Sequence, residues 1–336
     1  MPPRAAHPEL VKGRNFPSGL SAQNDKTVPD RLTAPSDAIK LEPEVCLLTH
    51  SLAVKLDPLW ARAPFPYGRS FAVGRFATLK TVRMARLYFG KELLSVYCYI
   101  VGDTLVDTGL SCYRDALLAL VKECGINCAL LTHHHEDHAG NAAALRAQGV
   151  KVLSSDGTRE LVAHDLPIHF YQHLIWGKMA PAKTDIFTDT VRIGPYLAEV
   201  IAAPGHCADQ VVFFVRQEGW LFAGDIFLSE RVKVFRRDED FAATVDTLRG
   251  LLQLDFDALL CAHKPHFTHG RRALAAKLDW LLNIEGEVRR RHVAGMPLHK
   301  IARECVKPPW IAAVLTAGDA TAYNLVHSIL AGPQPR

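Results

Sequence analysis

Four histidines and two acids are crowded into THHHEDHAGN, residues 132–141. Neutral imidazole nitrogens and carboxylate oxygens are ligands that zinc prefers in proteins. Alternation along an extended loop points His133 and His135 the same way. Asp137 and His138 lie beyond a bend and can face a neighbouring ion. The spacing H-x-H-x-D-H therefore predicts a metal site in a loop.

Three single residues farther along the chain can complete such a site. His206 follows AAPG, Asp225 ends LFAGD and His263 ends LLCAH, so each follows a short apolar strand. A site with two divalent ions about 3.5–4 Å apart needs a carboxylate that contacts both of them. In layered α/β chains, residues at the carboxyl ends of strands face a common cleft. We therefore expect these three residues to join the histidine loop there.

The segments around these residues indicate a layered α/β chain. Short apolar runs rich in β-branched and aromatic residues predict strands at 78–90, 93–109, 128–132, 151–155, 198–205, 211–215, 220–225 and 257–263. Helical spacing predicts helices at 113–125, 141–149, 156–165, 241–254, 272–295, 297–306 and 321–332. Residues 166–185 have no clean period and include Tyr171 and Trp176, so an insertion or substrate flap is expected there.

These patterns divide the chain into three parts. Residues 1–76 are rich in Pro, Ser and Asp, which predicts an N-terminal extension that is partly disordered or wraps the surface. Residues 77–272 contain the candidate ligands and form the expected catalytic domain. Residues 273–336 are expected to form a helical C-terminal appendage.

Composition narrows the class of protein. The 336 residues are 49% hydrophobic and 22% charged, as in a globular chain with a sizeable core, and the net charge of +4 is small. No apolar run of about 18 residues occurs, so no membrane span is expected. The eight scattered cysteines lack a Cys-x-x-Cys pair, which favours reduced thiols and a cytoplasmic location. A mitochondrial leader is only faintly indicated, because prolines interrupt the basic first 24 residues.

The motifs together resemble the metallo-β-lactamase fold superfamily over about residues 77–272. The resemblance rests on five motifs in a fixed order: DTG at 107–109, THHHEDHAGN, APGHCADQ, FAGD and CAHKP. It implies an α/β fold, a four-layer αββα sandwich of the metallo-β-lactamase type, with the metal site at one edge between the sheets. The helices after residue 272 would be appended to that sandwich.

The resemblance also implies a role for each candidate residue. The ligands of a first metal would be His133, His135 and His206. The ligands of a second metal would be Asp137, His138 and His263, with Asp225 bridging both ions. Asp107 would support the metal-site loops from behind the ligands. His134 and Glu136 are expected outside the ligand set, and His266 and His269 are the alternatives to His263.

Two departures from the family pattern bear on the activity. Cys207 follows His206 where relatives usually carry Ser or Thr. No cysteine occupies a ligand position, because Asp225 stands at the position that matches the cysteine of the Asp-Cys-His site in many zinc β-lactamases. Antibiotic hydrolysis is therefore not the expected role.

The expected function is that of a dinuclear zinc-dependent hydrolase, with two zinc ions per chain and iron or manganese as the alternative ions. A hydroxide between the ions would attack the carbonyl of a small ester, thioester or lactone, with Asp137 and Asp225 as the catalytic carboxylates. The alternatives are a metal-dependent nuclease, a mononuclear iron sulfur-dioxygenase of the same fold and a non-catalytic scaffold. The complete second ligand set argues against the last two.

The expected partner is a small-molecule substrate, and the sequence leaves open whether the chain forms an oligomer. Nucleic acid is the less favoured partner. Arg289, Arg290 and Arg291 could meet phosphates, but consecutive residues of a helix point in three directions, so a solvated surface is the preferred interpretation.

Overall fold

The structure is a computed structural model that describes residues 67–308, 314 and 316–332. Most of the expected extension at 1–76 lies outside these residues. Strand β1 (Tyr67–Phe76) begins ten residues before the expected start of the catalytic domain and pairs along the full length of β2 (Leu79–Tyr88). Gly68 and Gly74 interrupt the apolar run of β1, which is why its strand pattern is weak in the sequence.

The first sheet has seven strands in the order β1 to β7. Neighbours from β1 to β4 are antiparallel, and neighbours from β4 to β7 are parallel. Its other strands are β3 (Lys91–Val101), β4 (Thr104–Val106), β5 (Cys128–Leu130), β6 (Lys151–Ser154) and β7 (Asp185–Ile186). The long antiparallel strands β1–β3 and the parallel strands β4–β7 therefore belong to one continuous sheet.

The second sheet has five strands in the order β13-β11-β10-β9-β8, of which only β11 and β13 pair in parallel. The strands are β8 (Thr190–Ile193), β9 (Tyr196–Ala202), β10 (Val211–Val215), β11 (Trp220–Gly224) and β13 (Ala258–Cys261). Every residue of β10, β11 and β13 is buried, because both faces of these strands are covered. A separate two-stranded ribbon pairs β12 (Phe235–Arg236) with β14 (Ala320–Thr321).

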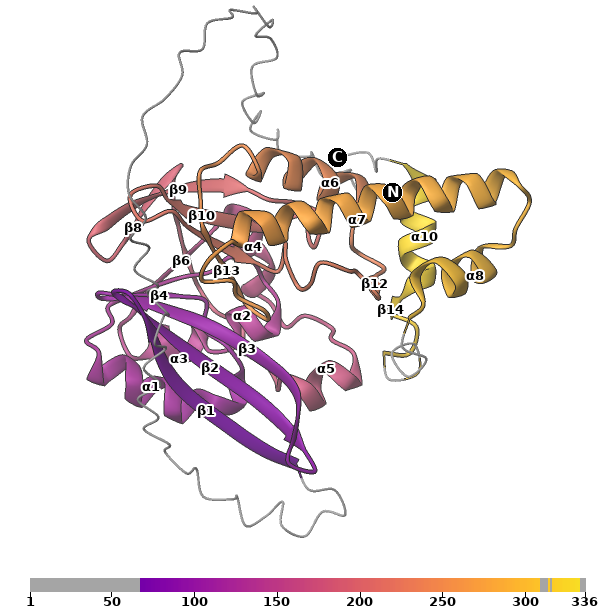
Figure 1. Cartoon of the computed structure of the whole chain (residues 1–336). Coiled ribbons are helices and arrows are strands. Elements are labelled where there is room, and N and C mark those ends of the chain that lie inside the picture. Colours follow the sequence, from indigo (N-terminus) through magenta and orange to yellow (C-terminus); the bar gives the residue numbers. More distant parts are fainter. Residues whose placement is uncertain (1–66, 309–313, 315, 333–336) are drawn as a thin grey trace, which may run out of the picture. The chain divides into compact units, whose positions relative to one another are not determined.

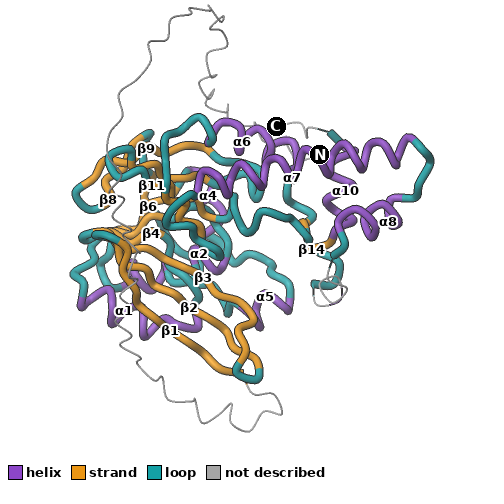
Figure 2. The backbone as a smooth tube through the Cα atoms, viewed as in Figure 1, coloured by secondary structure: helices purple, strands orange, loops and turns teal. Residues whose placement is uncertain are grey.

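Helices flank the two sheets (Figures 1 and 2). In the first half they are α1 (Arg114–Glu123), α2 (Glu136–Ala139), α3 (Ala142–Ala147), α4 (Asp156–Val162) and α5 (Phe170–Ile175). In the second half they are α6 (Phe241–Leu251), α7 (Gly270–Val293), α8 (Leu298–Ile301) and α10 (Ala322–Ala331). Figure 1 shows α1 and α3 on one outer side and α6 and α7 on the other, with the sheets between.

Three hydrophobic clusters hold these layers together. The cluster between the sheets includes Tyr99 of β3 and Phe222 of β11. A second cluster packs the first sheet against α1 and α3, for example through Met84 and Leu117. A third packs the second sheet against α6, α7 and α10 and includes Phe214. Three apolar interfaces separate four layers, so the predicted αββα sandwich is confirmed.

The C-terminal helices share the core of the second sheet. Helix α7 begins at Gly270, and its Leu274 and Leu281 belong to the same cluster as Leu248 of α6. Residues after 272 therefore close one face of the sandwich, and a boundary at 272/273 remains a proposal. None of the helices in the described ranges combines the length and the apolar character that crossing a bilayer requires.

The arginine run of α7 is engaged with carboxylates. Its ion pairs are those of Arg289 with Glu285, Arg290 with Glu287, and Arg291 with Glu287 and Glu304. These acids neutralise much of the positive charge of the run. A phosphate-binding role for the run gains no support from this arrangement.

The cluster between the sheets can be tested with a matched pair of substitutions. Phe222 has no exposed surface, whereas Phe89 at the tip of the β2–β3 hairpin is 62% exposed. We expect Phe222→Ala to lower the free energy of unfolding by about 3–5 kcal/mol because it leaves a cavity. Phe89→Ala should change it by only about 0.5 kcal/mol, since an exposed side chain loses little. Urea denaturation would measure both, and equal losses would contradict the assignment of the core.

Candidate metal centre

The candidate ligands meet at the carboxyl ends of strands from both sheets. His133 and His135 follow β5 of the first sheet, whereas His206, Asp225 and His263 follow β9, β11 and β13 of the second. The turn before His206 needs glycine: Gly205 has a φ of 138°, and a Cβ there would lie 2.6 Å from the Cα of Thr244. The layered fold thus brings together residues that lie up to 130 positions apart, from 133 to 263.

The first group consists of three buried histidines. His135 Nδ1 lies 3.0 Å from His133 Nε2 and 3.0 Å from His206 Nε2. Burial lowers the pKa of His133 and of His135 well below the usual value, so both imidazoles are neutral near pH 7. Three converging imidazole nitrogens form a typical divalent-metal site.

The second group combines two carboxylates with two histidines. His263 Nε2 lies 3.3 Å from Asp137 Oδ2 and 3.3 Å from Asp225 Oδ2. His138 Nε2 lies 3.2 Å from Asp225 Oδ1. The same Asp225 carboxylate approaches the first group, because its Oδ2 is 3.5 Å from His206 Nε2. Asp225 therefore lies between the two groups.

Two atoms of the second group test whether a cation fits here. His138 Nε2 and Asp225 Oδ1 are buried and have no hydrogen-bond partner, although they are only 3.2 Å apart, so their alignment is unsuitable for a hydrogen bond. Leaving such a group unsatisfied costs about 1–3 kcal/mol. A divalent cation contacting both atoms would satisfy them, and nitrogen and carboxylate oxygen are the donors that zinc accepts. The residues present fit a metal ion.

Asp107 holds the second group from behind. Its carboxylate accepts hydrogen bonds from the Thr132 backbone N–H at 2.8 Å and from its hydroxyl, and it lies 2.8 Å from His138 Nδ1. Because Nδ1 is engaged, Nε2 of His138 is presented to Asp225. Asp107 has a left-handed backbone, with φ 59°. A carboxylate behind a histidine both orients the ring and raises its basicity as a ligand.

Two further supports are not visible in the sequence. His263 Nδ1 lies 2.9 Å from the carbonyl oxygen of Ser95, and His206 Nδ1 lies 3.4 Å from Glu239 Oε1. Ser95 is one residue of a strand, and it contributes its backbone, which carries no sequence signal. Glu239 precedes the Asp240 cap of α6 and resembles any acid near a helix start.

Comparison with known proteins identifies the family of this site. A family model described as the metallo-beta-lactamase superfamily matches residues 92–263, which contain every candidate ligand. The chain belongs to the metallo-beta-lactamase superfamily.

Curated relatives in this superfamily are hydrolases by name. One is a thioesterase of Emericella nidulans, 29% identical over 169 residues that cover 48% of this chain and 44% of the relative. Another is a hydroxyacylglutathione hydrolase of Rhodobacter capsulatus, 33% identical over 149 residues that cover 44% of this chain and 51% of the relative. The chain thus spans about half the length of these relatives.

Solved structures of the superfamily have the same fold. A metallo-beta-lactamase family protein from Thermus thermophilus aligns with a TM-score of 0.56 and 18% identity, covering 76% of this chain and 95% of that one. A beta-lactamase domain protein from Burkholderia ambifaria aligns with a TM-score of 0.57 and 18% identity, covering 77% of this chain and 87% of that one. At this identity the likeness concerns the fold alone.

Three further histidines that the sequence offered as candidates or neighbours, His134, His266 and His269, lie outside the two groups of this superfamily member. His134 binds Asp209, through its backbone N–H at 3.0 Å and its Nδ1 at 2.8 Å. Cys207 lies beside that pair, and burial raises the pKa of its thiol well above the usual value. His266 forms an isolated β-bridge with Leu259, and His269 precedes the first turn of α7. Of the three histidines at 263–269, only His263 reaches the second group.

The expected flap at 166–185 contains α5 and lies against the site. Gln172 donates a hydrogen bond to Glu136 at 3.2 Å, and Tyr171 donates one to Asp319 Oδ2 at 2.7 Å. Arg236 joins the same region, because its Nε lies 3.5 Å from Asp319 Oδ2 and its Nη1 lies 3.5 Å from His135 Nε2. Sequence reasoning missed Arg236 and Asp319, which carry no motif and are brought together only by the ribbon β12–β14.

Neighbouring histidines provide a matched test of the first group. We expect His135→Ala to weaken metal binding at least about 10-fold, since it removes one of three converging nitrogens. His134→Ala should keep the metal content of the wild type, because His134 faces Asp209 instead. Elemental analysis after dialysis against a weak chelator would measure both variants. Equal metal content in the two would contradict the assignment of the ligands.

Proposed function

We propose that the protein is a hydrolase that holds two zinc ions and cleaves a small ester, thioester or lactone. The observation that carries this proposal is the position of the Asp225 carboxylate. One of its oxygens lies 3.2 Å from His138, and the other lies 3.3 Å from His263 and 3.5 Å from His206. One oxygen thus faces the second group and the other lies between the two groups, and a carboxylate so placed suits a bridge between two ions.

In this proposal each group holds one ion. The first ion would bind His133, His135 and His206, and the second would bind Asp137, His138 and His263, with Asp225 shared. Asp107 and Glu239 would orient His138 and His206 through their Nδ1 atoms. Iron and manganese are the alternative ions for the same donor set.

The reaction proposed is addition of water to a carbonyl. Bound zinc lowers the pKa of water toward neutrality and polarises the substrate carbonyl. For a thioester, the water oxygen joins the carbonyl carbon, the carbon–sulfur bond breaks and the thiol leaves with a proton. Burial would raise the pKa of Asp137, but His138 and His263 outweigh burial and lower it, so this carboxylate is ionised. It can accept the proton that the attacking water loses and pass it to the departing sulfur.

Among the candidate substrates, thioesters have the best support. The relatives named as a thioesterase and as a hydroxyacylglutathione hydrolase match the part of the chain that contains the site. Phosphodiester hydrolysis has less support, since the arginine run of α7 is engaged with carboxylates. A mononuclear iron dioxygenase would leave Asp137, His138 and His263 without a role.

Metal content and turnover together test the proposal. We expect about two zinc ions per chain, with hydrolysis of a thioester reporter and none of a phosphodiester reporter. Asp225→Asn should lower kcat/KM for the thioester about 100-fold or more, because it weakens the shared ligand. Asp246→Asn, on the exposed face of α6, is the matched control and should leave turnover unchanged. One iron per chain without any hydrolysis would redirect the assignment to sulfur oxidation.

A further inference from the structure

Lys277 is a buried cation in the middle of α7. Its exposed fraction is 5%, and its Nζ donates a hydrogen bond to the carbonyl oxygen of Ile226 at 2.5 Å. Within the described part of the chain, no carboxylate lies within ion-pair distance of this ammonium. An ammonium can donate three hydrogen bonds, and the carboxylates of Glu239 and Asp225, which act on this one from beyond ion-pair distance, offset the cost of its burial only in part.

Lys277 lines the same cavity as two of the proposed metal ligands. The cavity measures about 450 Å³ and includes His206 and Asp225 in its lining. This volume falls within the range of about 300–1,000 Å³ that is usual for small-ligand sites. A molecule bound beside Asp225 can therefore extend toward Lys277 without leaving the cavity.

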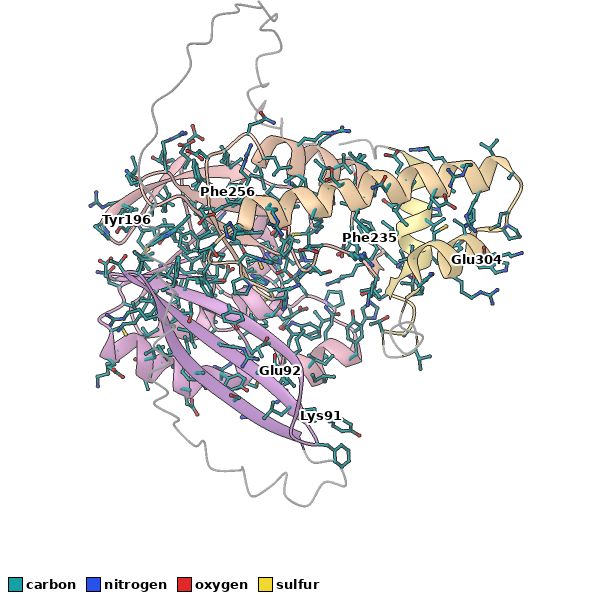
Figure 3. The ribbon with its side chains drawn as sticks, viewed as in Figure 1. Lys91, Glu92, Tyr196, Phe235, Phe256 and Glu304 are labelled. Carbon is teal, nitrogen blue, oxygen red and sulfur yellow. The ribbon has the colours of Figure 1, made fainter. Side chains whose placement is uncertain are left out.

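The walls of the cavity are apolar around this cation. They include Val232, Val234, Phe235 and Leu281, and Phe235 is labelled beside the C-terminal helices in Figure 3. Two acids of the lining already face histidines, since Asp225 faces His138 and His263, and Glu239 faces His206.

The other cations of the cavity differ from Lys277 in exposure. Arg231, Lys233 and Lys264 are exposed and lie along its rim. Rim cations attract an anion over a distance but bind it weakly, because water screens them. Only Lys277 among the described cations of the lining is buried. The cavity therefore suits a short apolar chain that ends in an anion.

We propose that Lys277 binds a carboxylate at the far end of the substrate's acyl group. The preferred substrates would then be thioesters or esters of acid-terminated acyl chains, such as a glutaryl group. This inference rests on the proposed hydrolase function. It makes Lys277 a substrate-binding residue that determines specificity, beyond its contact with Ile226.

A pair of thioesters that differ only in charge tests the proposal. Glutaryl-N-acetylcysteamine carries the carboxylate, and its terminal carboxamide analogue has the same shape without the charge. With the zinc-containing full chain, we expect Lys277→Met to lower kcat/KM for the glutaryl thioester about 10- to 100-fold, mainly through KM. The same variant should change kcat/KM for the carboxamide by less than about threefold, and Lys277→Arg should restore part of the loss, because it keeps the charge.

The controls separate binding from a structural effect. Lys300→Met, on the exposed surface of α8, should leave both thioesters unaffected. If Lys277→Met lowered turnover of both thioesters equally, Lys277 would act only through Ile226 and the position of Asp225, and the proposal would be wrong. No loss with either thioester would also overturn it.

A binding measurement keeps this inference distinct from the hydrolase assignment. If the wild type hydrolyses neither these two thioesters nor other thioester, ester and lactone reporters, the proposed function fails, and calorimetry with glutarate then tests the site alone. Weaker glutarate binding by Lys277→Met than by Lys300→Met would support the carboxylate site. Equal binding by the two variants would overturn it.

Discussion

Two buried carboxylates, four buried imidazoles and the partly buried imidazole of His263 lie together at the edge between the sheets, and the rest of the structure depends on keeping them there. Buried charges are tolerated only when other groups compensate them. Asp225 is the centre of that compensation, because its oxygens face histidines of both groups. Asp107, Glu239 and the carbonyl of Ser95 engage the opposite nitrogens of three of these rings. The candidate ligands thus face one another, and a second set of groups contacts three of the imidazoles from behind.

The fold class and the candidate ligands can both be recognised in the sequence, and the reason is physical. His133, His135, Asp137 and His138 are contiguous or nearly so, and His206, Asp225 and His263 each follow a strand whose apolar run is easy to recognise. The layered α/β class follows from the same runs, whereas the αββα sandwich is implied by the resemblance to the superfamily and is confirmed by the layers of the structure. The ligand roles themselves remain a proposal that the geometry supports.

Other features leave weaker traces in the sequence. β1 is interrupted by glycines, and β8 is short, so neither produces a clear strand pattern. Ser95 contributes only its backbone to the site, and Glu239 and Arg236 are ordinary surface-type residues until the fold places them beside histidines. Lys277 resembles a solvent-facing residue of an amphipathic helix, yet α7 turns it inward. Such contacts depend on packing across the chain, which local patterns do not encode.

The two ligand groups contain residues from both sheets, and this has a consequence for the stability of the protein. The histidine loop belongs to the first sheet, whereas His206, Asp225 and His263 extend from the second. An ion held in common would act as a cross-link between halves that otherwise meet through apolar packing and hydrogen bonds such as that from the Tyr97 N–H to the Ala262 carbonyl. The free energy of unfolding would then rise with the logarithm of the free metal concentration. The stability of the folded chain would therefore depend on the metal concentration of its surroundings, independently of any substrate.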